Sequence, residues 1–129
     1  MASLAPPHPE RWIEIRPEGL YITPGDFYVD PVRAVEHAVV THGHADHARP
    51  GHQKVLATQA TLDIMQVRYG NAAGDQQQAL DYGKSLRIGE VTVTMAPAGH
   101  VLGSAQIVLN YKGSRLVVSG DYKRRADPT

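Results

Sequence analysis

The stretch "THGHADHARPG" (41–51) crowds three histidines and one aspartate into six residues. Their imidazole and carboxylate groups suit zinc, and suit manganese or iron less well. Because side chains at i and i+2 share one face of a strand but not of a helix, His42 and His44 can reach one ion from a strand end. Asp46 and His47 lie further along the turn and point to a second position. The spacing therefore predicts two metal ions, against the alternative of a solvated polar loop.

Two later stretches offer further ligands. "APAGHVLGSA" places His100 after an expected strand and inside a glycine-flanked turn, and "VVSGDYKR" places Asp121 after an apolar strand. Taken alone, the first is typical of a structural histidine and the second of a turn aspartate. A carboxylate at a strand end can, however, bridge two cations about 3.5–4 Å apart, so beside the cluster we expect both residues to be ligands. The remaining histidines are expected to be surface or structural residues: His8, His37 and His52.

The elements that must position these ligands are mostly strands. Residues 11–31 alternate apolar and polar side chains in short pieces, which predicts two or three strands joined by hairpins. The segment 37–42 reads as a buried strand that runs directly into the histidine cluster, and 54–58 as another. After a polar loop over 71–78, the remaining expected strands are 79–82, 85–88, 91–96, 105–111 and 115–120, with a hairpin at 112–113.

One helix is expected between these strands. Thr58 can cap its N-terminus, and Gly70 with the following asparagine ends it. Its apolar stripe is formed by Leu62, Met65 and Tyr69, widened by Ile64 and Val67. A single helix in a β-rich chain predicts a sheet covered by helix on one face.

Composition sets the broad class. At 129 residues the chain holds one domain at most, and its 13 basic and 13 acidic residues cancel, so no overall positive field attracts nucleic acid or a membrane. It contains no cysteine, which excludes disulfides and thiolate ligands. No membrane-spanning run or signal peptide is evident, so a cytoplasmic protein is expected. Residues 1–11 are expected to form a flexible arm, and the sequence ends just after a strand-like run, as if cut short.

These residues resemble the metallo-β-lactamase fold superfamily. The cluster matches its H-x-H-x-D-H motif, His100 its next metal histidine, Asp121 its bridging aspartate, and Asp30 its first aspartate, which braces the site; Asp26 is a less favoured candidate for that role. "AGHVLGSA" and "VVSGDYKR" resemble the β-CASP nuclease branch. "WIEIRPEGLYITPGDFYVDP" and "THGHADHARPG" are similar to bacterial ligase-associated DNA exonucleases, which are also described as mRNA 3′-end processing factors.

The resemblance implies an α+β fold: residues 12–129 would form the N-terminal half of a metallo-β-lactamase αββα sandwich, with a mostly antiparallel mixed sheet and few helices. The C-terminal half, the β-CASP cap, a further metal histidine and a general acid in the cap would be absent. The isolated chain is therefore expected to be inactive.

The resemblance also implies a reaction, the hydrolysis of phosphodiester bonds with two divalent ions that activate a water. His42, His44 and His100 would hold the first ion, and Asp46 and His47 the second. Asp121 would bridge the two ions, and Asp46 would also orient the attacking hydroxide. The two ions would be zinc, with manganese as the alternative. Lys123 and Arg124 follow the bridging position and either contact backbone phosphates or belong to a solvated charge run.

Three functional classes stay open at this point. The first is a nuclease, a DNA exonuclease in DNA repair or an RNA-processing enzyme, with a ligase and a helicase as partners implied by the resemblance. The second is a small-molecule thioester or lactam hydrolase, which a glycine pair after the cluster would favour; the cluster is followed instead by "ARPG" (48–51). The third is an inactive metal-binding fragment.

Overall fold

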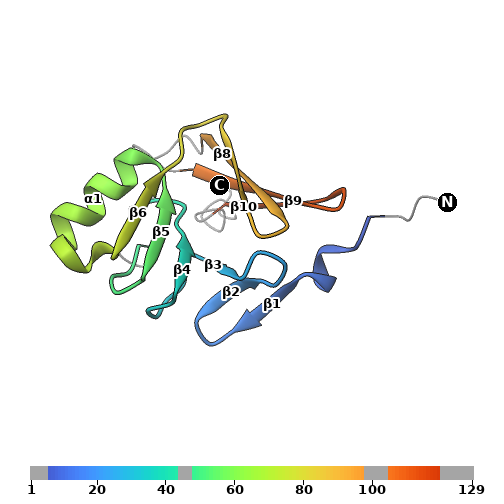
Figure 1. Ribbon diagram of the computed structural model, residues 1–129, viewed down its shortest axis with the longest axis horizontal. Coiled ribbons are helices and arrows are strands. Elements are labelled where there is room, and N and C mark those ends of the chain that lie inside the picture. Colours follow the sequence, from blue (N-terminus) through green and yellow to red (C-terminus); the bar gives the residue numbers. More distant parts are fainter. Residues whose placement is uncertain (1–5, 44–47, 98–104, 120–129) are drawn as a thin grey trace, which may run out of the picture.

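The structure is a computed structural model that describes residues 6–43, 48–97 and 105–119. In this part of the chain, two β-sheets lie against each other, and one α-helix covers the outer face of the first sheet (Figure 1). This arrangement confirms the predicted α+β class with a mixed sheet and few helices. None of the helices in the described ranges is long and apolar enough to span a bilayer.

The first sheet contains six strands within the described residues, in the order β1-β2-β3-β4-β5-β6. The pairs β1–β2 and β2–β3 are antiparallel, whereas β3–β4, β4–β5 and β5–β6 are parallel. The hairpins near the N-terminus were predicted, and the parallel half of the sheet extends them. The strands are β1 (Ile13–Arg16), β2 (Gly19–Ile22), β3 (Phe27–Val29), β4 (His37–Val39), β5 (Lys54–Ala57) and β6 (Gln76–Ala79).

The second sheet is an antiparallel meander with the strand order β10-β9-β8-β7 among the described residues. Its hairpin between β9 and β10 lies where it was predicted, with Lys112 at φ 49° and Gly113 at φ 83°, which suits a tight turn that needs positive φ at both residues. The strands are β7 (Ser85–Ile88), β8 (Val91–Pro97), β9 (Ala105–Tyr111) and β10 (Ser114–Ser119).

Helix α1 (Gln59–Tyr69) begins at Thr58, whose hydroxyl accepts a hydrogen bond from the Thr61 N–H, and ends at Gly70, which has φ 59°. Both ends were predicted from capping residues. A short 3₁₀ turn, η2 (Gly70–Ala73), follows the helix, and another, η1 (Pro9–Arg11), precedes β1.

Two apolar layers explain why β4 and β5 are apolar on both faces. Val39 and Leu56 point into the core between the sheets, whereas Ala38 and Val55 point toward α1, where Met65 is fully buried. A strand that is covered on both sides reads as a continuous apolar run, which is why these two strands were predictable. The core between the sheets consists mainly of Trp12, Ile22, Phe27, Val29, Val91, Val93, Met95, Ile107 and Leu109.

Three details of the sequence prediction were wrong. The expected polar loop contains β6, because Gln76–Ala79 pairs with β5 through the backbone while all its side chains are exposed, so no apolar pattern marks the strand. The expected strand over 79–82 is accordingly reduced to the end of β6 and an isolated bridge at Tyr82. Val67 was expected in the apolar stripe of α1, but it is 89% exposed because it lies on the outer side of the helix.

Candidate metal site

The segments that carry the predicted ligands follow strands that end at one edge of the sandwich. The N–H of Ala105, the first residue of β9, donates a hydrogen bond to the carbonyl of Thr41 at 2.7 Å. Ala105 also pairs with Pro97, the last residue of β8. The chain just after β4 therefore meets the end of β8 and the start of β9, although these strands belong to two different sheets.

Strand β10 ends at the same edge. Its last residue, Ser119, pairs with Gln106, the neighbour of Ala105. Pro97 and Ser119, the last described residues before His100 and Asp121, therefore lie at the edge where Ala105 contacts Thr41.

His42 is the one predicted ligand that lies within the described residues, and it is 1% exposed. Within the described ranges, no group of three or more histidine, cysteine, aspartate or glutamate side chains lies close enough together to hold a metal. The other predicted ligands and phosphate contacts lie outside these ranges, and their roles stay predictions: His44, Asp46, His47, His100, Asp121, Lys123 and Arg124.

Asp30 is joined to His42 through Thr41. The Asp30 carboxylate accepts two hydrogen bonds from Thr41, one from the backbone N–H to Oδ1 at 2.7 Å and one from the hydroxyl to Oδ2 at 2.6 Å. The Thr41 Oγ1 lies 2.9 Å from Nδ1 of His42. Asp30 follows β3 and has φ 47°, a backbone conformation that aspartate tolerates better than most residues.

This chain of contacts sets the ring tautomer of His42. The single Thr41 hydroxyl proton is donated to Asp30, so Oγ1 accepts a hydrogen bond from the His42 Nδ1–H. Nε2 is then the ring nitrogen with the lone pair, which is the form of histidine that binds a metal. The donor chemistry of His42 therefore fits the predicted ion. Sequence reasoning did not single out Thr41, although a hydroxyl residue directly before the first histidine was visible.

Asp26, the less favoured candidate for the bracing aspartate, lies elsewhere. It is exposed on the turn between β2 and β3 and accepts a hydrogen bond from the Tyr21 hydroxyl. That hydrogen bond raises the pKa of Tyr21 to about 12. Among the hydrogen bonds of the described residues, Asp30 and not Asp26 is the carboxylate that contacts the residue next to His42.

The remaining histidines have local structural contacts. His8 accepts a hydrogen bond from the Glu10 N–H at the start of η1. His52 is 1% exposed, and its Nδ1 accepts a hydrogen bond from the Val35 N–H at 3.1 Å. Burial lowers the pKa of His52. These contacts agree with the structural and surface roles expected from the sequence.

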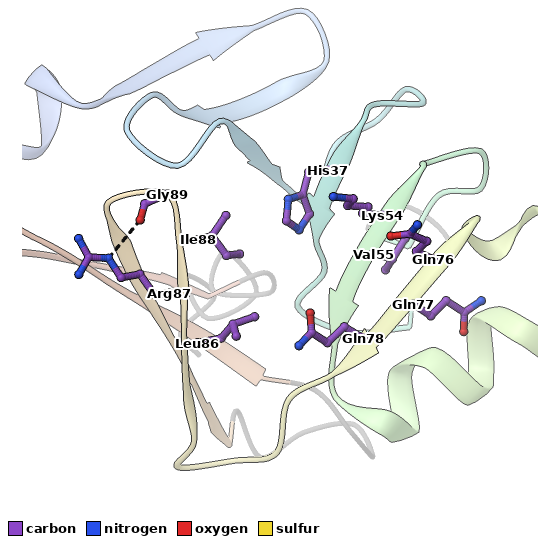
Figure 2. A pocket seen from close by; sticks show the side chains of 10 residues that line it. All are labelled: His37, Lys54, Val55, Gln76, Gln77, Gln78, Leu86, Arg87, Ile88 and Gly89. Atoms are coloured by element: carbon purple, nitrogen blue, oxygen red, sulfur yellow. Dashed lines mark hydrogen bonds between the residues drawn. The ribbon is translucent and has the colours of Figure 1, made fainter.

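A pocket of about 590 Å³ lies at the other end of the strands (Figure 2). It is lined by His37, Lys54 and Gln76, the first residues of β4, β5 and β6, and by β7. Figure 2 shows Leu86 and Ile88 of β7 pointing into it, whereas Arg87 points away. Burial, and then the nearby Lys54 ammonium, lower the pKa of His37. Since the histidine cluster follows the opposite end of β4, this pocket is separate from the candidate metal site.

The fold has a counterpart among solved structures. The flavodiiron protein from Giardia intestinalis has a TM-score of 0.57 to this chain at 16% identity, with 70% of this chain and 29% of that chain covered. At this identity the likeness concerns the fold alone. The two stacked sheets with a covering helix are part of a metallo-β-lactamase fold.

Curated relatives identify the branch. A "Probable DNA ligase" of Opitutus terrae is 30% identical over 109 residues, covering 83% of this chain and 10% of the relative. "Ribonuclease TTHA0252" of Thermus thermophilus is 32% identical over 123 residues, covering 77% and 28%. "Endoribonuclease YSH1" of Mycosarcoma maydis is 29% identical over 126 residues, covering 72% and 14%. The chain belongs to the β-CASP branch of the metallo-β-lactamase fold superfamily.

Two facts bound this assignment. No family model matches the chain. The chain also spans only 10%, 28% and 14% of the lengths of these three relatives. The assignment to the family therefore rests on the similarity to individual relatives. It does not by itself assign the activity of a whole protein to this chain.

Proposed function

We propose that the protein hydrolyses phosphodiester bonds of nucleic acid at a divalent metal site on the edge where β4, β8, β9 and β10 meet. The observation that carries the proposal is the hydrogen bond from Ala105 to Thr41, which joins the two sheets directly beside His42. The names of the Thermus and Mycosarcoma relatives, a ribonuclease and an endoribonuclease, support the reaction class.

The proposed roles follow the predicted ligand set. His42, His44 and His100 would hold one cation, Asp46 and His47 would hold a second, and Asp121 would be shared by both. When bound, two divalent cations supply Lewis acidity and an activated water. The contact from Asp30 through Thr41 supports this scheme, because it keeps the proton of His42 on Nδ1 and directs Nε2 to the ligand role. Zinc is the proposed metal, with manganese as the alternative.

The substrate is proposed to be single-stranded DNA, which the protein would degrade as an exonuclease in DNA repair, and RNA is the alternative. The Opitutus relative, named as a DNA ligase, supports the first, and the two relatives named as ribonucleases support the second. Lys123 and Arg124 would contact backbone phosphates, which supply affinity without base selectivity. A ligase and a helicase are the proposed partners, and the cytoplasm the proposed location.

The test uses the protein purified at its full natural length and an Asp121→Ala variant. Both are incubated with an end-labelled single-stranded DNA and an RNA of matched sequence, with zinc or with manganese. Turnover should be lost in the variant, because the bridging carboxylate fixes the distance between the ions. Binding of either polymer should change little, because the lysine and arginine contacts remain.

Two results would contradict the proposal. Near-normal cleavage by Asp121→Ala would exclude the two-metal scheme. An unmutated protein that cleaves neither polymer but hydrolyses a thioester or a lactam would replace the nuclease with a small-molecule hydrolase.

A further inference from the structure

The last turn of α1 contacts the backbone at Gly43, inside the histidine cluster, and at Ala48, directly after it. The Arg68 guanidinium donates a hydrogen bond from Nη1 to the carbonyl of Gly43 at 2.6 Å. The next residue, Tyr69, donates a hydrogen bond from its hydroxyl to the carbonyl of Ala48 at 2.7 Å. Gly43 and Ala48 directly flank residues 44–47, which carry three of the predicted ligands.

The two donor side chains contact each other at the end of the helix. The Arg68 guanidinium carbon lies 5.7 Å from the centre of the Tyr69 ring, within the range of a cation–π contact. The helix ends directly after this pair, at Gly70. The bond from Arg68 is charge-assisted, and such bonds are stronger than neutral ones.

Side-chain packing brings the helix close enough for these bonds. A Cβ atom on Gly43 would lie 2.9 Å from Cγ2 of Ile64, which is closer than real carbon contacts allow. Ile64 and Arg68 are four residues apart and therefore lie on the same face of α1. The glycine between the first two histidines thus permits α1 to lie against the motif backbone.

We infer that Arg68 and Tyr69 are positioning residues for the metal site: their hydrogen bonds fix the backbone at Gly43, directly after His42, and at Ala48. The inference rests on the proposed function for the metal, and on the two hydrogen bonds for the geometry. Fixing the backbone at Gly43 and Ala48 restricts the chain next to His42 before any metal binds. The entropy lost on binding the metal is then smaller.

The test measures metal affinity in the full-length protein after metal removal, by competition between the protein and a chelator for zinc. Tyr69→Phe removes only the hydroxyl, and Arg68→Met removes the charged donor while keeping most of the side-chain length. Partners that orient metal ligands typically cost about 10–100-fold in affinity when lost, so each variant should bind zinc about 10-fold more weakly. Arg68→Lys keeps a cationic donor and should recover most of the loss.

Two matched controls separate positioning from general stability. Tyr111→Phe removes a hydroxyl from a ring that packs on Trp12, and Arg115→Met removes an exposed arginine of β10. Both should bind zinc as the unmutated protein does. The absorption spectrum of the cobalt-loaded protein should change in Tyr69→Phe but not in Tyr111→Phe, whereas the melting temperature of the metal-free protein should fall little in either.

The outcomes distinguish this inference from the proposed function. An unmutated protein that binds no zinc and no cobalt overturns the proposed function, and the inference with it. If the unmutated protein binds zinc and both Tyr69→Phe and Arg68→Met bind it equally well, only the inference is overturned. A loss of affinity matched by an equal destabilisation of the metal-free protein also overturns it, because the residues would then act on the fold as a whole.

Discussion

Replacing Thr41 with valine should destabilise the metal-free protein. Valine has nearly the same shape as threonine but lacks the hydroxyl, and the side chain at this position is 1% exposed. The hydroxyl donates to Asp30 Oδ2 at 2.6 Å and contacts His42 Nδ1 at 2.9 Å. Both of these hydrogen bonds are lost in Thr41→Val, whereas the bond from the Thr41 N–H to Asp30 remains.

The magnitude follows from these two bonds. A hydrogen bond to a charged group contributes about 1.5–3 kcal/mol to stability, and a neutral one about 0.5–1.5 kcal/mol. Thr41→Val should therefore lower the free energy of unfolding by about 2–4 kcal/mol. Thr41→Ser keeps the hydroxyl and loses one methyl group, so it should cost only about 1 kcal/mol.

Urea unfolding of the metal-free variants measures this difference at pH 7. The account predicts a lower midpoint for Thr41→Val than for Thr41→Ser, with the same dependence on urea concentration. A double-mutant cycle with Asp30→Asn should give a coupling energy of about 1 kcal/mol or more, since the two side chains are in direct contact. Equal stability of the valine and serine variants would refute the assigned contact between Asp30, Thr41 and His42.

The remaining predictions concern stability and use the same unfolding assay. Burial lowers the pKa of His52, so the unfolded state takes up a proton first as pH falls. The free energy of unfolding should therefore decrease below about pH 6.5. His52→Asn should make this decrease smaller, and an unchanged decrease would exclude His52 as its source. Gly43→Ala should cost about 1–3 kcal/mol because the new Cβ meets Ile64, and adding Ile64→Ala should recover part of that loss; no recovery would argue against the packing. Trp12→Phe removes the hydrogen bond from Nε1 to Ser114 Oγ and should cost about 1–3 kcal/mol, whereas an unchanged midpoint would exclude the contact.

The elements with local signals were predictable from the sequence. Thr58 and Gly70 marked the ends of α1 through capping, and the positive-φ turn at 112–113 marked a hairpin. The two strands next to the histidine cluster were visible because both of their faces are buried. Strand β6 was missed because its side chains are exposed, and its pairing with β5 depends only on backbone groups.

The candidate site was predictable in its residue types but not in its supports. The spacing of the cluster indicated metal ligands, and the resemblance favoured Asp30 over Asp26. The roles of Arg68 and Tyr69 had no local signal, because their partners, Gly43 and Ala48, lie 25 and 21 residues earlier in the chain. Tyr69 was expected only as part of the apolar stripe, and its hydroxyl became informative once the helix was placed against the first sheet.

The most direct test of the central claim is the metal content of the full-length protein and of its His100→Ala variant. Elemental analysis after dialysis reports the number of ions per chain. His100 follows β8, whose end meets Thr41 through Ala105, so it is expected to share an ion with His42. The account predicts two divalent ions per unmutated chain and the loss of one of them in the variant. Two tightly held ions in His100→Ala would contradict it.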